Sequence, residues 1–125
     1  MTDTPAHHIA AILPCSDLDA STAFYEKLGL SVVSDYGSYR LLEDGKGWRL
    51  HLTNESRPTW PERDHNPFGL YLYTNRVDEL AEHMRDAILG PEKAPTHKPW
   101  GIYEFALSDP DETLVRIGWP SALVT

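Results

Sequence analysis

The order of the predicted elements constrains this chain more than any other feature, because one strand, one helix and three strands are followed by the same order again. In the first half the predicted segments are a strand at 9–13, a helix to about Lys27, and strands at 30–34, 39–42 and 48–53. In the second half they are a strand at 69–74, a helix, a short edge strand within 94–99, and strands at 102–107 and 113–118. No repeat of sequence accompanies this shared order of elements.

Both predicted helices carry helical periodicity and end signals. Ser16 and Asp19 are spaced as a capping box at the start of the first helix, and Gly29 ends it. Asn75 is the predicted N-cap of the second helix. The apolar residues of that helix recur at helical spacing, at Val77, Leu80, Ala81, Met84 and Ile88.

This order predicts an α+β fold class. One βαβββ unit cannot bury both faces of its sheet, whereas two units can close a curled mixed sheet around a cleft, with helices on the outer faces. We therefore predict one domain over residues 1–125, with modules at about 8–54 and 68–119. Residues 54–67 hold three prolines and form the predicted linker loop, long enough to suggest a role in function.

Composition narrows the class of partner. The net charge of −8 argues against nucleic acid, since binding phosphates needs clustered Lys and Arg. It favours a cationic small molecule as ligand, and it is equally explained as an acidic surface that keeps the protein soluble. No apolar run approaches the ~20 residues of a membrane span, and residues 1–8 show no secretion signal. We expect a cytoplasmic protein with no membrane partner. Its one cysteine, Cys15, cannot form an internal disulfide.

Three segments of the sequence resemble a known family. The segments Leu13-Pro-Cys-Ser-Asp-Leu18 and Phe24-Tyr-Glu-Lys-Leu-Gly-Leu30 are similar to the opening of the vicinal oxygen chelate superfamily of glyoxalases, bleomycin resistance proteins and extradiol dioxygenases. The segment Lys98-Pro-Trp-Gly-Ile-Tyr-Glu-Phe-Ala-Leu-Ser-Asp-Pro-Asp111 resembles the bleomycin-resistance branch. Glu112 stands where the family usually has glycine, and a positive φ there would cost about 1 kcal/mol. Residues 30–40 and 54–67 match poorly.

The resemblance also implies where a metal would be bound in enzymes of the superfamily. Their ligand positions fall here on Ala10, His51, Leu70 and Arg116. Only His51 can ligate a metal, because alanine and leucine have no donor atom and arginine is a fixed cation. A shift of one residue, which brings Tyr71 into place, does not restore the site. We therefore predict no metal and no cofactor.

Strand alternation predicts the residues that line the cleft. The inward-facing set is Arg49, His51, Thr53, Leu70, Leu72, Glu104, Ala106, Leu114 and Arg116. The set predicted to pack under the helices is Tyr103, Phe105, Val115 and Ile117. The predicted ligand-binding residues combine polar and apolar cleft positions with aromatic rings: Tyr39, His51, Trp60, Leu70, Trp100, Glu104 and Arg116. Glu104 and Arg116 are equally explained as a cross-strand ion pair, and Trp100 as a packing residue at a turn.

The resemblance implies a homodimer with ligand clefts between subunits. Our first hypothesis is a metal-free binding protein that confers antibiotic resistance by sequestering a bleomycin-like cationic glycopeptide, or a similar amphipathic ligand, without catalysing a reaction. The alternative is an enzyme of the superfamily, either a metal-dependent lyase, isomerase or dioxygenase, or a metal-free enzyme with His51 as the base near Glu104.

Overall fold

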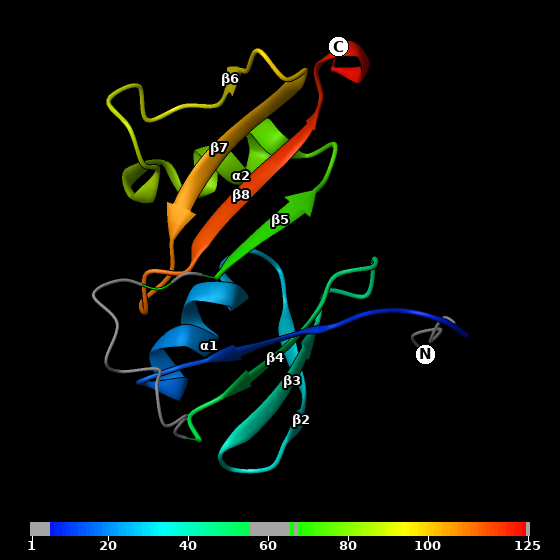
Figure 1. The fold of residues 1–125 in the computed structure, drawn as a ribbon, viewed down its shortest axis with the longest axis vertical. Coiled ribbons are helices and arrows are strands. Elements are labelled where there is room, and N and C mark those ends of the chain that lie inside the picture. Colours follow the sequence, from blue (N-terminus) through cyan, green and yellow to red (C-terminus); the bar gives the residue numbers. More distant parts are fainter. Residues whose placement is uncertain (1–5, 56–65, 67, 125) are drawn as a thin grey trace. The chain divides into compact units, whose positions relative to one another are not determined.

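The structure, a computed structural model, describes residues 6–55, 66 and 68–124. The chain divides into two compact units, Met1–Arg63 and Asp64–Thr125, and each is described by itself. The described residues of each unit form one α-helix and one four-stranded mixed sheet (Figure 1). The α+β class and the two βαβββ modules predicted from the sequence are confirmed. No helix in the described residues is long and apolar enough to cross a membrane.

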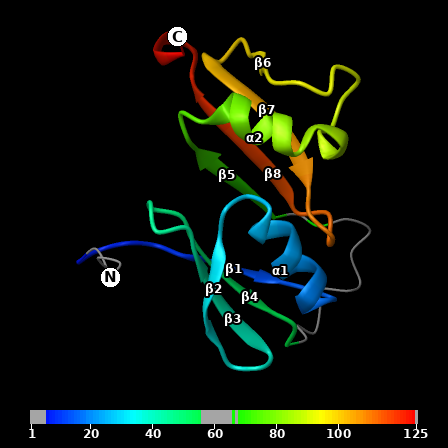
Figure 2. The same ribbon diagram turned by 180° about the vertical axis from the view of Figure 1, so that it is seen from behind.

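Unit 1 follows the predicted order of elements. They are β1 (Ala11–Pro14), α1 (Leu18–Glu26), β2 (Ser31–Asp35), β3 (Tyr39–Glu43) and β4 (Arg49–Thr53). The strands pair in the order β1-β4-β3-β2, with β1 parallel to β4 and the other neighbours antiparallel. Strand alternation gives this sheet two unlike faces, and α1 covers one of them (Figure 2).

The face under α1 is mainly apolar because the register places leucines from three neighbouring strands on it. They are Leu13, Leu42, Leu50 and Leu52, all buried. The helix contributes the fully buried Tyr25. The N-cap of α1 is Asp17, whose carboxylate accepts the N–H of Ala20 at 3.1 Å, and not Ser16 as predicted. An Asp here has the same physical role, since it satisfies a free N–H of the first turn.

Unit 2 repeats the order with a longer connection after its helix. Its elements are β5 (Gly69–Tyr73), α2 (Val77–His83), the 3₁₀ turn η2 (Arg85–Ala87), β6 (Thr96–His97), β7 (Ile102–Ser108), β8 (Leu114–Pro120) and the 3₁₀ turn η3 (Ser121–Leu123). The strands pair in the order β5-β8-β7-β6, with β5 parallel to β8. The helix α2 lies across one face of this sheet (Figure 2).

The face under α2 carries all four residues predicted for it. Phe105, Val115 and Ile117 are buried, with Leu107 beside them. Tyr103 shares the face of Phe105, and its hydroxyl donates to Asp78 of α2. The helix is shorter than its apolar periodicity suggested, because Met84 is its C-cap and Ile88 follows η2, although both side chains are buried. The predicted Asn75 cap is wrong: Arg76 is the N-cap, and its side chain makes no capping bond.

In the turn between β7 and β8, Glu112 has a positive φ. Its φ is 64°, the left-handed conformation that glycine adopts without strain. The carboxylate of Asp109 braces this turn by accepting the N–H groups of Asp111 at 2.9 Å and Thr113 at 2.8 Å. These bonds hold the residue in place despite its side chain.

Candidate functional site

Each sheet has one face that its own helix does not cover, which we call the helix-free face. In unit 2 the register places Tyr71 and Ala106 beside Arg116 on this face. Glu104 lies on the same face, opposite Gly118 on β8. Three neighbouring strands therefore bring polar side chains to one side of the sheet.

Glu104 is the centre of this cluster, and its side chain is almost completely buried, at 1% exposure. Its Oε1 accepts hydrogen bonds from the Tyr71 hydroxyl at 2.7 Å and from Trp100 Nε1 at 3.1 Å. Its Oε2 accepts a bond from Arg116 Nη1 at 2.6 Å, which is also an ion pair. Both oxygens of the carboxylate are thus used by residues of the same unit.

The ionisation of the cluster follows from these contacts. Burial by itself would raise the pKa of Glu104, but the hydrogen bonds from Tyr71, Arg116 and Trp100 and the charge of Arg116 outweigh burial, so the pKa is lowered. Burial, and then the hydrogen bond to Glu104 and its charge, raise the pKa of Tyr71 above its ordinary value. The cluster therefore contains one carboxylate, one guanidinium and two neutral hydrogen-bond donors.

Gly118 makes the cluster sterically possible. A Cβ atom at this position would lie 2.4 Å from the Tyr71 hydroxyl oxygen, 2.8 Å from Ile102 Cγ2 and 2.9 Å from Glu104 Cβ. Real Cβ atoms do not approach other atoms so closely, so the tyrosine reaches the carboxylate across a backbone that carries no side chain.

Around the buried carboxylate, several side chains reach the surface. Trp100 is 60% exposed, and the side chain of Arg116 is 40% exposed. Tyr73 is exposed as well, and its ring lies 4.6 Å from that of Tyr71, centroid to centroid. Since the Trp100 ring is mostly exposed while its N–H is fixed to Glu104, it is not a buried packing residue. This arrangement can offer a flat ring and a cation to a ligand.

Unit 1 carries a different pair on its helix-free face. The Tyr39 hydroxyl lies 2.9 Å from His51 Nδ1, and the two rings meet edge to face. In the register, Ile12 and Leu41 flank His51. The predicted orientation of His51, opposite to the buried leucines of β4, is confirmed.

The residues at the implied metal positions do not fit a metal ion. Ala10 precedes β1 and has no donor, and Leu70 has none either. Arg116 is ion-paired to Glu104, and His51 is the one ligating side chain of the set. Among the described residues no three His, Cys, Asp or Glu side chains come together in a way that could hold a metal.

The structure corrects the predicted orientation of β5. Leu70 pairs with Val115 and Leu72 with Ile117, so both leucines share the face covered by α2 and not the face of Arg116. The reason is that β5 is offset by one residue from the predicted alternation, which exchanges its two faces. Tyr71 takes the place predicted for Leu70.

The other predicted site residues fall into two groups. Glu104, Arg116 and Trp100 are brought together in unit 2, and Tyr39 with His51 in unit 1. The ion pair considered for Glu104 and Arg116 is present. Trp60 lies outside the described residues. Sequence reasoning missed Tyr71 as a site residue, although a glycine within β8 signals close approach by a neighbour.

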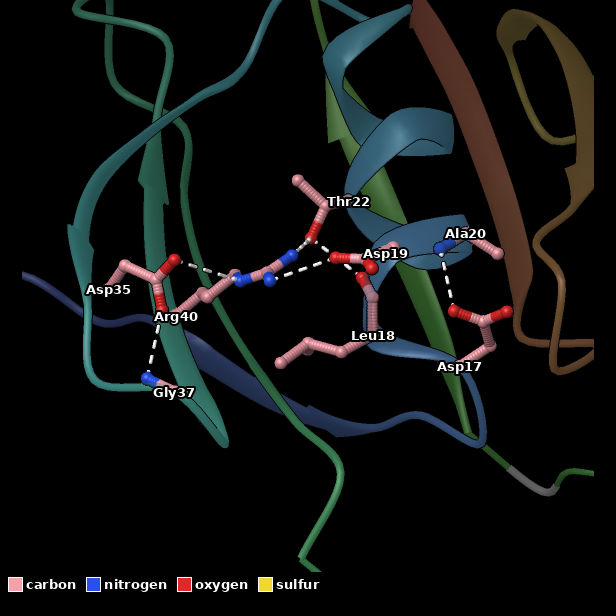
Figure 3. Close-up of polar contacts among 8 residues, drawn as sticks. All are labelled: Asp17, Leu18, Asp19, Ala20, Thr22, Asp35, Gly37 and Arg40. Carbon is pink, nitrogen blue, oxygen red and sulfur yellow. Dashed lines mark hydrogen bonds and ion pairs between the residues drawn. The ribbon is translucent and has the colours of Figure 1, made fainter.

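A second charged cluster lies on the opposite, helix-covered side of unit 1 (Figure 3). Arg40 extends from β3 toward α1, where it pairs with Asp19 at 2.9 Å and donates to the Thr22 hydroxyl at 3.0 Å. Its Nε lies 3.4 Å from Asp35 Oδ2, an ion pair whose geometry is too poor for a hydrogen bond. Arg40 thus ties the start of α1 to the end of β2, a role within the fold.

Comparison with known proteins places this geometry in context. A family model described as the Glyoxalase/Bleomycin resistance protein/Dioxygenase superfamily matches residues 6–117. A bleomycin resistance protein of Klebsiella pneumoniae is 30% identical over 118 aligned residues, covering 84% of this chain and 86% of the relative. A bleomycin resistance protein of Geobacillus stearothermophilus is 26% identical over 118 residues, covering 82% of this chain and 89% of the relative.

Solved structures agree with the sequence comparisons. The crystal structure of a bleomycin-binding protein complexed with bleomycin is 26% identical to this chain and superimposes with a TM-score of 0.71. The match covers 91% of this chain and 98% of that one. The similarity therefore extends over both units.

Proposed function

Because the chain belongs to the glyoxalase/bleomycin resistance protein/dioxygenase superfamily, we propose that it is a metal-free binding protein of the bleomycin-resistance type. It sequesters a bleomycin-like glycopeptide, or a similar amphipathic molecule, without catalysing a reaction. Two named bleomycin resistance proteins and a similar protein solved with bleomycin support this proposal. The net charge of −8 supports attraction of a ligand that carries positive charge.

The observation that carries the proposal is the exposed Trp100 ring fixed by a buried carboxylate. A tryptophan that is 60% exposed normally has freedom to reorient, whereas here its N–H is bonded to Glu104. A ring held in one orientation can stack on a heteroaromatic group with little loss of conformational entropy. The exposed Tyr73 and the half-exposed Arg116 extend the same helix-free face.

The working form of the protein is a homodimer in this proposal, located in the cytoplasm, with the two units of each chain acting as one ligand-binding domain. Both helix-free faces support an assembly, since they expose apolar side chains, Ile12 in unit 1 and Tyr73 and Leu114 in unit 2. Exposed apolar surface of this kind is typical of interaction sites. Sedimentation of the full chain at several concentrations measures the oligomeric state directly.

Titration with metal-free bleomycin, followed by tryptophan fluorescence and calorimetry together, tests the function. We expect saturable binding at about micromolar concentration or tighter, near one ligand per subunit. Trp100→Phe should weaken binding about tenfold, because the indole surface and its N–H bond are lost. Absence of binding at about millimolar bleomycin would refute bleomycin as the ligand class, and turnover of bleomycin would refute simple sequestration.

A further inference from the structure

The two charged groups on the helix-free face of unit 2, Glu104 and Arg116, differ in whether a ligand can bind them. Glu104 is 1% exposed, and both of its oxygens already accept hydrogen bonds from Tyr71, Trp100 and Arg116. The carboxylate therefore cannot receive a cation or a donor from a ligand without losing one of these partners. The charged side chain that does reach the surface beside it is Arg116.

Arg116 has guanidinium N–H groups that are not used by Glu104. A guanidinium carries five N–H groups in a planar fork, and the bond to Glu104 occupies Nη1. Within the described ranges 6–55 and 68–124, no other hydrogen bond of this side chain is seen. Its remaining N–H groups suit the paired oxygens of a carboxylate, or a carbonyl oxygen.

We propose that the helix-free face of unit 2 binds its ligand through an acceptor group, a carboxylate or carbonyl oxygen held by Arg116, next to a flat ring stacked on Trp100. Glu104 acts as the positioning residue for both. This inference rests on the proposed function, because it assigns one part of the ligand to one face of the binding protein. It also places the cationic part of a bleomycin-like ligand away from Glu104.

The role of Glu104 follows from its geometry. One carboxylate holds the Trp100 indole on one oxygen and the Arg116 guanidinium on the other, so the ring and the cation have a fixed spacing. The Tyr71 hydroxyl adds a third bond that holds the carboxylate itself. Long side chains such as arginine lose much rotational freedom when they bind, and here part of that loss has already occurred on folding.

A matched pair of small probes tests the chemistry without bleomycin. 2-Naphthoate and 2-naphthylmethylammonium share one ring system and differ in the sign of their charge. For the full chain, we expect 2-naphthoate to shift the Trp100 indole N–H resonance saturably and to bind at least about tenfold more tightly than the ammonium probe. Equal or tighter binding of the ammonium probe, or no binding of 2-naphthoate, would overturn the proposal.

Variants assign the effect to the right residue. Arg116→Gln should weaken 2-naphthoate about tenfold, and Arg116→Lys should restore part of the affinity. Arg85→Gln removes an exposed arginine of the same unit, paired with Glu82, and should leave the affinity unchanged. An equal loss in the Arg85 and Arg116 variants would show a general effect of charge and contradict a specific site.

Glu104→Gln tests whether Glu104 positions Trp100 and Arg116 or only contributes to the stability of the fold. This variant keeps the charge of Arg116, so a smaller affinity for 2-naphthoate together with a moved Trp100 N–H resonance would support positioning. Unchanged affinity in a variant with native near-ultraviolet circular dichroism would contradict it. Should Glu104→Gln fail to fold, Trp100→Phe with 2-naphthoate tests the same coupling, because it removes the indole while leaving Glu104 and Arg116 paired.

Titration of the Arg116→Gln variant with metal-free bleomycin distinguishes the two proposals. If wild-type protein ignores bleomycin but binds 2-naphthoate through Arg116, the acceptor site stands and bleomycin sequestration fails. If wild-type protein binds bleomycin and Arg116→Gln binds it equally well, sequestration stands and the acceptor site is overturned.

Discussion

The central strands of the two units, β4 and β8, are built alike but carry different chemistry. His51 lies between Ile12 and Leu41 in the register of its sheet, and Arg116 lies between Tyr71 and Ala106 in the same arrangement. The backbone bonds beyond them correspond too, because Cys15 N–H donates to Thr53 O and Thr74 N–H donates to Gly118 O. Position by position, the two sheets can therefore be compared.

The comparison shows where each unit places its charge. Arg40 of β3 corresponds to Phe105 of β7, and both lie under the helix of their own unit. Tyr39 corresponds to Glu104, and both lie on the helix-free face. At these two positions, unit 1 has a charged residue beneath the helix and an uncharged aromatic residue on the helix-free face, whereas unit 2 has an aromatic residue beneath the helix and a buried carboxylate on the helix-free face.

One further position explains how unit 2 tolerates that charge. Thr53 of β4 corresponds to Gly118 of β8. The Thr53 hydroxyl donates to Ser38 O at 2.9 Å and accepts the Glu55 N–H at 3.1 Å, so it fills its position with local bonds. The glycine leaves that space to Tyr71, which brings a third donor to the carboxylate.

Gly118→Ala is the most severe test of this difference. The new methyl group would meet Tyr71 and Glu104 at distances no real Cβ shows, so both must move and the buried carboxylate loses a donor. We expect a loss of about 2–3 kcal/mol in the free energy of unfolding, measured by urea denaturation. Adding Tyr71→Phe removes the hydroxyl that clashes most, and the double variant should lose less than the sum of the two single variants. Additive losses would show that the glycine does not act through Tyr71.

Glu104→Gln compared with Glu43→Gln tests the placement of charge. Each carboxylate pairs with an arginine on a helix-free face, Glu104 with Arg116 and Glu43 with Arg49 at 2.8 Å. Glu104 is more deeply buried and holds three donors, so we expect a loss of about 2 kcal/mol for its variant and about 1 kcal/mol for the Glu43 variant. Equal losses in denaturant unfolding would show that the two pairs are equivalent.

Acid unfolding gives the same comparison a second measurement. The pKa of Glu104 is lowered in the folded state, so its contribution is complete above the unfolded value of about 4.5 and is lost as pH falls through the folded value. The free energy of unfolding of Glu104→Gln should therefore fall less steeply than that of wild-type protein below about pH 4.5. Parallel curves would indicate that Glu104 titrates normally.

The fold could be predicted well from the sequence because its strands and helices depend on local patterns of apolar residues. Apolar patterns and turn signals located the strands and helices of the described residues. The predicted charged residues of the site, Glu104 and Arg116, lie together for the same reason: β7 and β8 are adjacent and their alternation was correct.

The site was predicted less well, because its details depend on register and on contacts between distant residues. Leu70 was assigned to the wrong face, since the alternation in β5 between leucine and tyrosine does not state which set faces the helix. The partners of Arg40 come from a helix and from the end of a strand, and no local sequence pattern predicts these contacts. The bond from Tyr71 to Glu104 depends on the absence of a side chain at Gly118, on a third strand.

Arg40→Met tests the ion pairs that Arg40 forms beneath α1. The corresponding residue of unit 2 is Phe105. The variant keeps an unbranched apolar chain but loses the hydrogen bond to Thr22 and the ion pairs with Asp19 and Asp35. Because both carboxylates are largely exposed, we expect a loss of only about 1 kcal/mol in the free energy of unfolding. Ligand titrations should be unchanged, since this cluster lies on the helix-covered side. A loss of bleomycin affinity would assign the cluster a role in binding.

Tyr103→Phe removes the corresponding tie of unit 2 and should have the smallest effect. The Tyr103 hydroxyl donates to Asp78 in the first turn of α2 at 2.6 Å, in an exposed position, so we expect a loss of about 0.5 kcal/mol at neutral pH. This bond, with burial and the charge of Asp78, raises the pKa of Tyr103 to about 12. A raised pKa means that the contribution is complete below the ordinary value of 10 and is lost as pH rises through about 12. The free energies of unfolding of wild-type protein and Tyr103→Phe, measured with denaturant, should therefore differ at neutral pH and converge in strong alkali. A difference that stays constant with pH would show that the hydrogen bond is not its source.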